Sequence, residues 1–185
     1  KRFLIANGSL NTKVLVVFPP AIEKNWKTTF RLFGIDRHTK FVTNGRLDNI
    51  LDGDLNYWAK EDYDLILVDE AHRYRNHTSQ MFSALQRICK APRRGEGLIE
   101  GKKKKVMLIS ATPLNNRPQD LYYQLLLFQD ARRSTLPETN LQNFFGPIIQ
   151  EYREIIRQEH PDINRIRELY KEIRERVIQP ITIRR

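Results

Sequence analysis

The amino-acid sequence predicts an α/β fold, in which a parallel sheet has helices on both faces and a C-terminal helical protrusion follows. Three observations lead to this prediction. Short apolar runs rich in branched residues recur in the first part of the chain, helical patterns alternate with them, and no strand signal is found from about Asp130 to Pro180. Strands that alternate with helices favour right-handed βαβ units, which bring parallel strands into one sheet.

The strands are predicted by apolar runs that do not alternate with polar residues. Such runs are typical of strands that are covered on both faces, as in a parallel sheet. The clear runs are Val14–Phe18, Leu65–Val68 and residues 106–109, and residues 40–43 form a weaker fourth candidate.

The helices are predicted where apolar residues recur at steps of three and four. The segment 21–33 has this spacing at Ile22, Trp26, Phe30 and Phe33, so Trp26 is expected to anchor a helix in the core. Pro161 and Asp162 separate the last two helices, and Pro180 ends the second of them. The other helices with this spacing are predicted over 79–90, 119–128, 144–156 and 163–177.

The composition excludes several classes of protein. No apolar run approaches the ~20 residues that cross a bilayer, which excludes a transmembrane protein. Cys89 is the sole cysteine, so neither a disulfide-stabilised domain nor a cysteine-based zinc site is expected. No signal peptide is visible, and the sequence therefore predicts a cytoplasmic protein with no membrane partner.

The formal net charge of +10 over 185 residues indicates a polyanionic partner, with a basic but unspecialised surface as the alternative. Part of this charge flanks a glycine-rich segment within residues 93–105, which we expect to be a basic loop. In the last third of the chain, Glu and Arg alternate. This pattern predicts i,i+4 ion pairs on exposed helix faces rather than a binding stripe.

Two adjacent carboxylates, Asp69 and Glu70, directly follow the strand predicted over Leu65–Val68. Open α/β sheets bind ligands at this end of their strands. Phosphoryl transfer to water needs one carboxylate that holds Mg²⁺ and another that orients or deprotonates the attacking water. Asp69 suits the metal role and Glu70 the water role, and His72 is placed to link them to a neighbouring strand. The alternative is that the acidic pair caps the next helix.

Small hydroxylated residues follow the strand predicted over 106–109, in the order Ser110, Ala111, Thr112. If this strand lies beside the acidic one, the hydroxyl groups can hydrogen-bond to His72 or Glu70. They would then connect phosphate chemistry to a moving element. The alternative is an ordinary Ser/Thr turn before a helix.

Together these segments resemble the Swi/Snf-type family of superfamily-two helicase-like ATPases. Residues 69–72 form a DEAH box similar to motif II, and residues 110–112 are similar to motif III. The run from 14 to 20, with Asn25 and Trp26, resembles motif Ia. Residues 183–185 resemble the arginine pair that closes the first lobe of the family.

The resemblance implies a fold and an activity. Residues 1–130 would be part of a RecA-like ATPase lobe, and residues 131–185 a helical protrusion that returns to the sheet. The parent protein would be an ATP hydrolase that uses Mg²⁺, translocates along double-stranded DNA and has a second RecA-like lobe. The residues that match family roles are Asp69 (Mg²⁺, through water), Glu70 (catalytic base), His72, Ser110, Ala111 and Thr112 (coupling), and Pro19, Lys24 and Asn25 (DNA backbone).

The sequence departs from the family pattern in one important respect. It contains no G-x-x-x-x-G-K-[ST] phosphate-binding loop, and residues 97–103 are too short and wrongly placed to serve as one. We expect that loop upstream of Lys1, the second lobe beyond Arg185, and no activity from the isolated chain. The alternatives are a strand-separating helicase, a restriction-enzyme motor subunit, or a non-enzymatic α/β scaffold.

Overall fold

The computed structural model describes residues 12–94, 101–110 and 117–181. The chain divides into two compact units, Lys1–Ala111 and Thr112–Arg185. The sequence placed the change from sheet to helical protrusion at about residue 130. The unit boundary falls earlier because α5 (Pro118–Leu126) packs against α6 (Leu141–Ile155).

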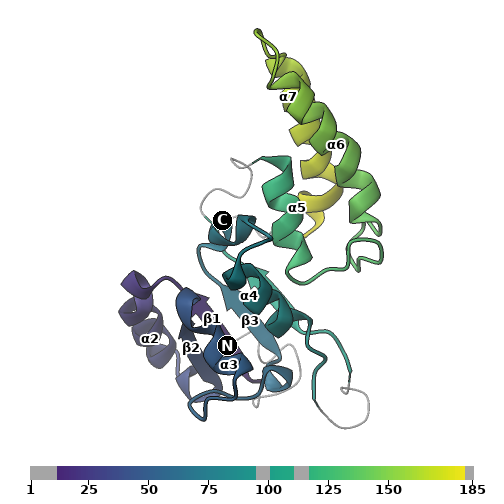
Figure 1. The fold of residues 1–185 in the computed structure, drawn as a ribbon. Helices are drawn as coiled ribbons and strands as arrows, with labels where there is room; N and C mark the ends of the chain where they lie inside the picture. Colours follow the sequence, from purple (N-terminus) through teal and green to yellow (C-terminus); the bar gives the residue numbers. More distant parts are fainter. Residues whose placement is uncertain (1–11, 95–100, 111–116, 182–185) are drawn as a thin grey trace. The chain divides into compact units, whose positions relative to one another are not determined.

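The first unit contains a four-stranded, fully parallel sheet in the order β2-β1-β3-β4. Figure 1 labels the first three of these strands. All three predicted strands are confirmed, and so is the weaker fourth. Because the strands are parallel, their carboxyl ends meet at one edge of the sheet. The strand bounds are β1 Val14–Phe18, β2 Thr39–Thr43, β3 Leu65–Val68 and β4 Lys105–Leu108.

Helices cover both faces of this sheet, as the continuous apolar strands require. On one face, Val16 and Phe18 of β1 form a core with Phe30 of α2 (Glu23–Leu32). On the other face lie α3 (Leu47–Leu51) and α4 (Gln80–Lys90), which contact each other. The residues of β1 and β3 that point to this second face are fully buried: Leu15, Val17, Ile66 and Val68. The predicted fold class, an α/β parallel sheet covered on both faces, is thus confirmed.

Two of these helices illustrate what the sequence pattern can and cannot detect. The start of α4 was predicted, and the hydroxyl group of Ser79 caps it by accepting a hydrogen bond from the Phe82 N–H. The short helix α3 was not predicted. It has five residues, and its two buried side chains, Leu47 and Ile50, are too few to establish a helical period.

All regular elements of the second unit are helices in the residues that the structure describes. It consists of α5, α6 and α7 (Ile163–Ile173), followed by a π-helix, Arg174–Ile178, and a 3₁₀ turn, Gln179–Ile181. Asp162 starts α7 as predicted, because its carboxylate accepts a hydrogen bond from the Arg165 N–H at 3.0 Å. The return to the sheet was expected at the end of the chain; Ile181 lies in the 3₁₀ turn, and residues 182–185 lie outside the described residues. The core of this unit includes Leu121, Leu125, Phe144, Phe145, Ile148, Leu169, Ile173 and Val177.

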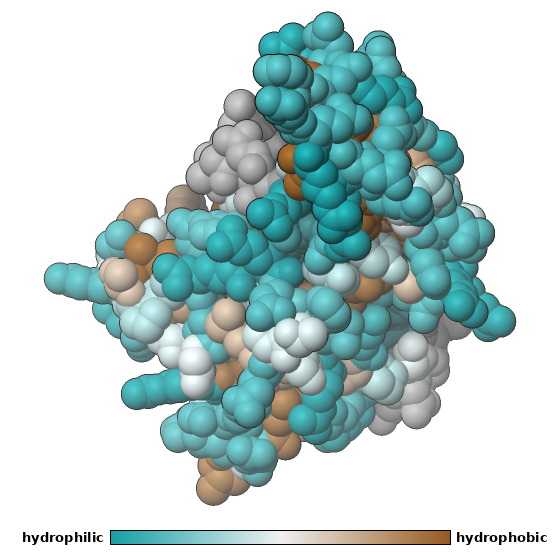
Figure 2. All heavy atoms as spheres, turned by 45° about the horizontal axis from the view of Figure 1, so that its top comes forward, coloured by the Kyte–Doolittle hydropathy of each residue, from teal (hydrophilic) through white to brown (hydrophobic). Residues whose placement is uncertain are grey.

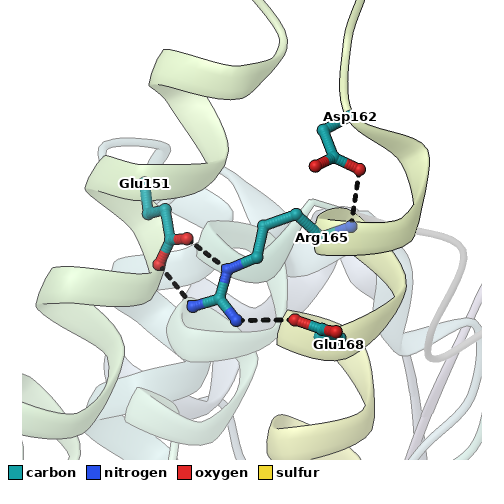
Figure 3. Close-up of polar contacts among 4 residues, drawn as sticks. All are labelled: Glu151, Asp162, Arg165 and Glu168. Atoms are coloured by element: carbon teal, nitrogen blue, oxygen red, sulfur yellow. Dashed lines mark hydrogen bonds and ion pairs between the residues drawn. The ribbon is translucent and has the colours of Figure 1, made fainter.

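Arg165 connects α6 and α7 on the surface of this unit (Figure 3). Its guanidinium donates to both carboxylate oxygens of Glu151 on α6 and, at 2.8 Å, to Glu168 on α7. This interaction lowers the pKa of Glu151 below its usual value. Further along the same surface, Arg176 pairs with Glu172 at i,i+4. The ion pairs expected from the Glu/Arg alternation are therefore present, and exposed pairs of this kind add little stability.

The face drawn in Figure 2 is mostly hydrophilic, with apolar side chains exposed in small groups. No helix in the described ranges is long and apolar enough to span a membrane. The exposed large apolar side chains include Leu32, Phe33, Leu55, Ile156, Ile163 and Ile181.

Lys104, at the entrance to β4, is a buried cation that should make stability depend on pH. Its ammonium group donates to the backbone oxygen of Ala91, and burial lowers its pKa to about 8 from 10.5. Between these values the unfolded state binds a proton that the folded state does not, so this contribution to stability rises with pH. Below pH 8 the full penalty of a buried charge applies.

The measured quantity is the free energy of unfolding of Lys104→Met minus that of the wild type. We expect this difference to fall by ~1–3 kcal/mol between pH 7 and pH 10, because the wild type loses its buried charge. Denaturant unfolding at a series of pH values measures this difference. The matched control is Lys103→Met, an exposed neighbour, for which the difference should stay constant. A Lys104→Met difference that does not change with pH would contradict the prediction.

Candidate functional site

The carboxyl edge of the sheet brings the acidic pair and Ser110 to neighbouring strand ends. Strands β3 and β4 are adjacent, with Val68 aligned with Leu108, so Asp69 and Glu70 emerge beside Ile109 and Ser110. The expectation that these two strands are neighbours is confirmed. Ala111 and Thr112, predicted to complete this part of the site, lie outside the described residues.

Backbone hydrogen bonds of the sheet continue into the site. The Asp69 N–H donates to the Val17 oxygen of β1 at 2.8 Å, and the Ala71 N–H donates to the Ile109 oxygen at 3.0 Å. The residues after β3 are therefore held on both sides by the neighbouring strands. This fixes the point from which each carboxylate leaves the backbone.

The Asp69 carboxylate is oriented by two hydrogen bonds. Its Oδ1 accepts from the Glu70 N–H at 2.8 Å, and its Oδ2 accepts from the indole N–H of Trp26 at 2.8 Å. The Trp26 ring packs edge-on against Phe30, with ring centroids 5.5 Å apart. Trp26 was predicted as a core anchor, and its ring has that role. The hydrogen bond to Asp69 was not predicted, because no local pattern connects residues that are 43 positions apart.

Glu70 has an unusual backbone, with φ 52° and ψ 46° in the left-handed region. Among the described residues it is the only non-glycine with positive φ. This conformation costs about 1–2 kcal/mol for a residue with a Cβ atom. Its carboxylate is partly exposed, and Oε2 lies 3.1 Å from Nδ1 of His72. His72 thus contacts Glu70 within the same turn, while the link from His72 to a neighbouring strand stays a prediction.

The alternative that the acidic pair only caps a helix is not supported by this geometry. The 3₁₀ helix Ala71–Arg75 follows the pair, and no side-chain hydrogen bond caps its start. The Asp69 oxygens accept hydrogen bonds from Trp26 and from the Glu70 N–H, and Oε2 of Glu70 lies beside Nδ1 of His72. Strand ends that place carboxylates in this way at an open edge are typical of ligand sites in α/β sheets.

The residues predicted to contact nucleic acid lie near the same edge, at the end of β1. Pro19 is buried and precedes a 3₁₀ turn, Pro20–Ile22, while Lys24 and Asn25 are exposed in the first turn of α2. Lys24 and Asn25 are therefore available to an external ligand. The buried ring of Pro19 directs the chain from the strand into the turn, and its contact with nucleic acid stays a prediction.

Sequence reasoning missed a second link at this edge, between Asn44 and Tyr74. Asn44 directly follows β2 and is buried, and its Oδ1 accepts a hydrogen bond from the Tyr74 hydroxyl at 3.0 Å. Burial raises the pKa of Tyr74 above its ordinary value, which already keeps the hydroxyl protonated at neutral pH. This bond ties the end of β2 to the 3₁₀ helix that follows the acidic pair.

The residues at this edge fit a magnesium ion that is bound mainly by substrate and water. The described residues contain no cluster of three or more His, Cys, Asp or Glu side chains that could hold a metal. Mg²⁺ in nucleotide sites usually takes one or two carboxylates, several waters and substrate phosphates. A single oriented carboxylate, Asp69, is sufficient for this mode of binding.

A groove of about 350 Å³ lies elsewhere, between α6 and α7 of the second unit. Its floor is apolar, and its charged groups are already paired with one another, as Arg165 is with Glu151 and Arg176 with Glu138. It contains none of the residues predicted to carry chemistry. We therefore assign the candidate site to the sheet edge.

No protein-family model matches the sequence, and neither does any curated protein. Among solved structures, the chain is similar to the Sulfolobus solfataricus SWI2/SNF2 ATPase core in complex with dsDNA, with a TM-score of 0.60 and 16% sequence identity. The similarity covers 100% of this chain and 36% of that chain. The chain therefore has the fold of about a third of such an ATPase core, which supports the RecA-like, SNF2-like fold expected from the motifs.

The left-handed backbone at residue 70 predicts an inverted order of stability for two substitutions. Glu70→Gly should be more stable than Glu70→Ala by about 1 kcal/mol, because glycine adopts positive φ without strain while both variants lose the contact with His72. Denaturant unfolding measures the difference. At Lys27, an exposed residue in the interior of α2, the order should reverse, with Ala more stable than Gly by about 1 kcal/mol. Equal stability of the two Glu70 variants would contradict the prediction.

Proposed function

We propose that this chain is part of the first motor lobe of an ATP-dependent double-stranded DNA translocase. The observation that carries the proposal is the position of Asp69 and Glu70, which leave β3 at the carboxyl edge of a parallel sheet beside the end of β4. The similarity of the fold to a SWI2/SNF2 ATPase core supports the same assignment.

In this proposal the two carboxylates divide the chemistry of ATP hydrolysis. Bound Mg²⁺ would neutralise charge that develops on the phosphates during transfer to water. Asp69, oriented by its two hydrogen bonds, would hold the hydrated ion through water. Glu70 would orient the attacking water and accept its proton, with His72 restraining the carboxylate from 3.1 Å away.

The end of β4 would connect this chemistry to movement. Ser110 follows β4, the strand that pairs with β3. A change in the contacts between Glu70 and the γ-phosphate would therefore shift the end of β4 as well. We propose that His72, Ser110, Ala111 and Thr112 form the coupling element. Two-state rearrangements that follow the γ-phosphate are a common device in nucleotide hydrolases.

DNA would be bound through its phosphate backbone. Lys24 and Asn25 are exposed in the first turn of α2, where an ammonium and an amide group can donate to phosphate oxygens. Such contacts position a duplex without reading its sequence. The formal net charge of +10 favours the same partner.

The catalytic assignment is tested by Glu70→Gln in the full-length protein. We expect ATP binding to be retained and the hydrolysis rate to fall at least ~100-fold, because the amide cannot accept a proton from water. The matched control is Glu61→Gln, the same chemical change at the amino end of β3, where Glu61 pairs with Lys60. Hydrolysis at the wild-type rate by Glu70→Gln would remove Glu70 from the mechanism.

The DNA contact is tested by the double variant Lys24→Ala, Asn25→Ala. We expect weaker binding to duplexes of any sequence. The slope of the logarithm of the binding constant against the logarithm of the salt concentration should fall by about 1, for the one cation removed. The control is Lys40→Ala, which removes one positive charge from β2, where the ammonium lies over the Trp58 ring. If the slope is the same for the double variant and the wild type, Lys24 does not bind a phosphate.

A further inference from the structure

The hydrogen bond from Trp26 to Asp69 joins the helix on one face of the sheet to the carboxylate at its edge. The indole Nε1 lies 2.8 Å from Oδ2 of Asp69. The partly buried indole ring is restrained, because it packs against Phe30 and against the edge of the core that β1, β3 and α2 share. A donor held in this way also holds its acceptor.

Both hydrogen bonds to Asp69 come from neutral groups, the Trp26 indole N–H and the Glu70 backbone N–H. Aspartates at the opposite edge of the sheet are bound differently. Asp62 is ion-paired with Lys13 and Arg94, and Asp64 with Arg93. A cationic partner at Asp69 would repel a divalent ion, whereas a neutral donor orients the carboxylate and leaves its negative charge available.

The two donors approach different oxygens, so together they define the plane of the carboxylate. Each carboxylate oxygen has two acceptor sites, and one hydrogen bond leaves the other site open. The remaining positions can accept hydrogen bonds from water molecules that surround a metal ion. Pre-orientation of this kind raises the affinity for a ligand, because less conformational freedom is lost on binding.

From these contacts we infer that Trp26 is a positioning residue for the metal-binding carboxylate: its indole N–H holds Asp69 in the orientation that binds hydrated Mg²⁺. The inference rests on the proposed function, in which Asp69 is the magnesium residue. It assigns to the polar atom of Trp26 a role separate from the packing role of its ring.

The first test is spectroscopic and does not depend on catalysis. This chain has two tryptophans, Trp26 and Trp58, so ¹⁵N-tryptophan labelling of the full-length protein gives an indole N–H signal for each. The substitutions Trp26→Phe and Trp58→Phe assign the two signals. We expect Asp69→Ala to move the Trp26 signal towards that of a free indole, and Mg²⁺ with a non-hydrolysable ATP analogue to shift Trp26 but not Trp58.

The second test removes the N–H group while keeping the shape of the ring. Replacement of Trp26 by β-(3-benzothienyl)alanine substitutes sulfur for the indole N–H. We expect the Mg²⁺ concentration that gives half-maximal ATP hydrolysis to rise about tenfold, as for loss of a hydrogen bond to a charged group. The rate at saturating Mg²⁺ should stay within about twofold of the wild type, because the metal restores the orientation.

The matched control is the same replacement at Trp58, which lies in the same unit and packs against Lys13, Lys40 and Tyr63 rather than Asp69. It should leave the Mg²⁺ requirement unchanged. An unchanged requirement for the Trp26 replacement would overturn the inference. So would a lower rate at saturating Mg²⁺ with the same requirement, since that is the result of a purely structural role.

Failure of the inference and failure of the proposed function give different results. If the wild-type protein hydrolyses ATP with Mg²⁺ and Glu70→Gln abolishes hydrolysis, the proposed function stands whatever the Trp26 variants do. If Mg²⁺ and nucleotide leave both indole signals in place and the protein does not hydrolyse ATP, the proposed function fails and the inference fails with it.

Discussion

The parallel pairing of β3 between β1 and β4 is the constraint on which the candidate site depends. Each residue of β3 is buried, so its register against the two neighbours is strongly specified. The pairing continues past the end of the strand, through the bonds from Asp69 to Val17 and from Ala71 to Ile109. The backbone of the acidic pair is therefore set by the sheet rather than by a flexible loop, which gives the carboxylates a fixed origin.

The main features of the fold were predictable because burial leaves a simple trace in the sequence. A strand covered on both faces needs apolar residues at every position, and Val14–Phe18 and Leu65–Val68 satisfy this requirement. Parallel strands end at a common edge, so the sequence alone brought Asp69, Glu70 and Ser110 together. The change of unit was harder to place, since the apolar pattern of α5 does not show whether it packs on the sheet or on α6.

The finer geometry of the site was not predictable, because it depends on contacts between distant residues. Apolar spacing correctly assigned the ring of Trp26 to the core, but the partner of its N–H is 43 positions away. The link between Asn44 and Tyr74 spans 30 positions. The left-handed backbone of Glu70 results from the turn between β3 and the next helix, and glutamate gives no local signal for it.

At Glu70, the residue that would give the highest local stability differs from the residue that is present. Glycine is the residue that its backbone favours, and a strained conformation persists only where the surrounding structure determines it, as the buried sheet does here. The carboxylate does not recover this cost by capping the following helix, and its partly exposed contact with His72 contributes little. Local stability therefore does not explain a glutamate at this position. The proposed reaction needs a carboxylate next to Asp69, so the strained backbone is an argument in favour of the proposal that Glu70 has a catalytic role.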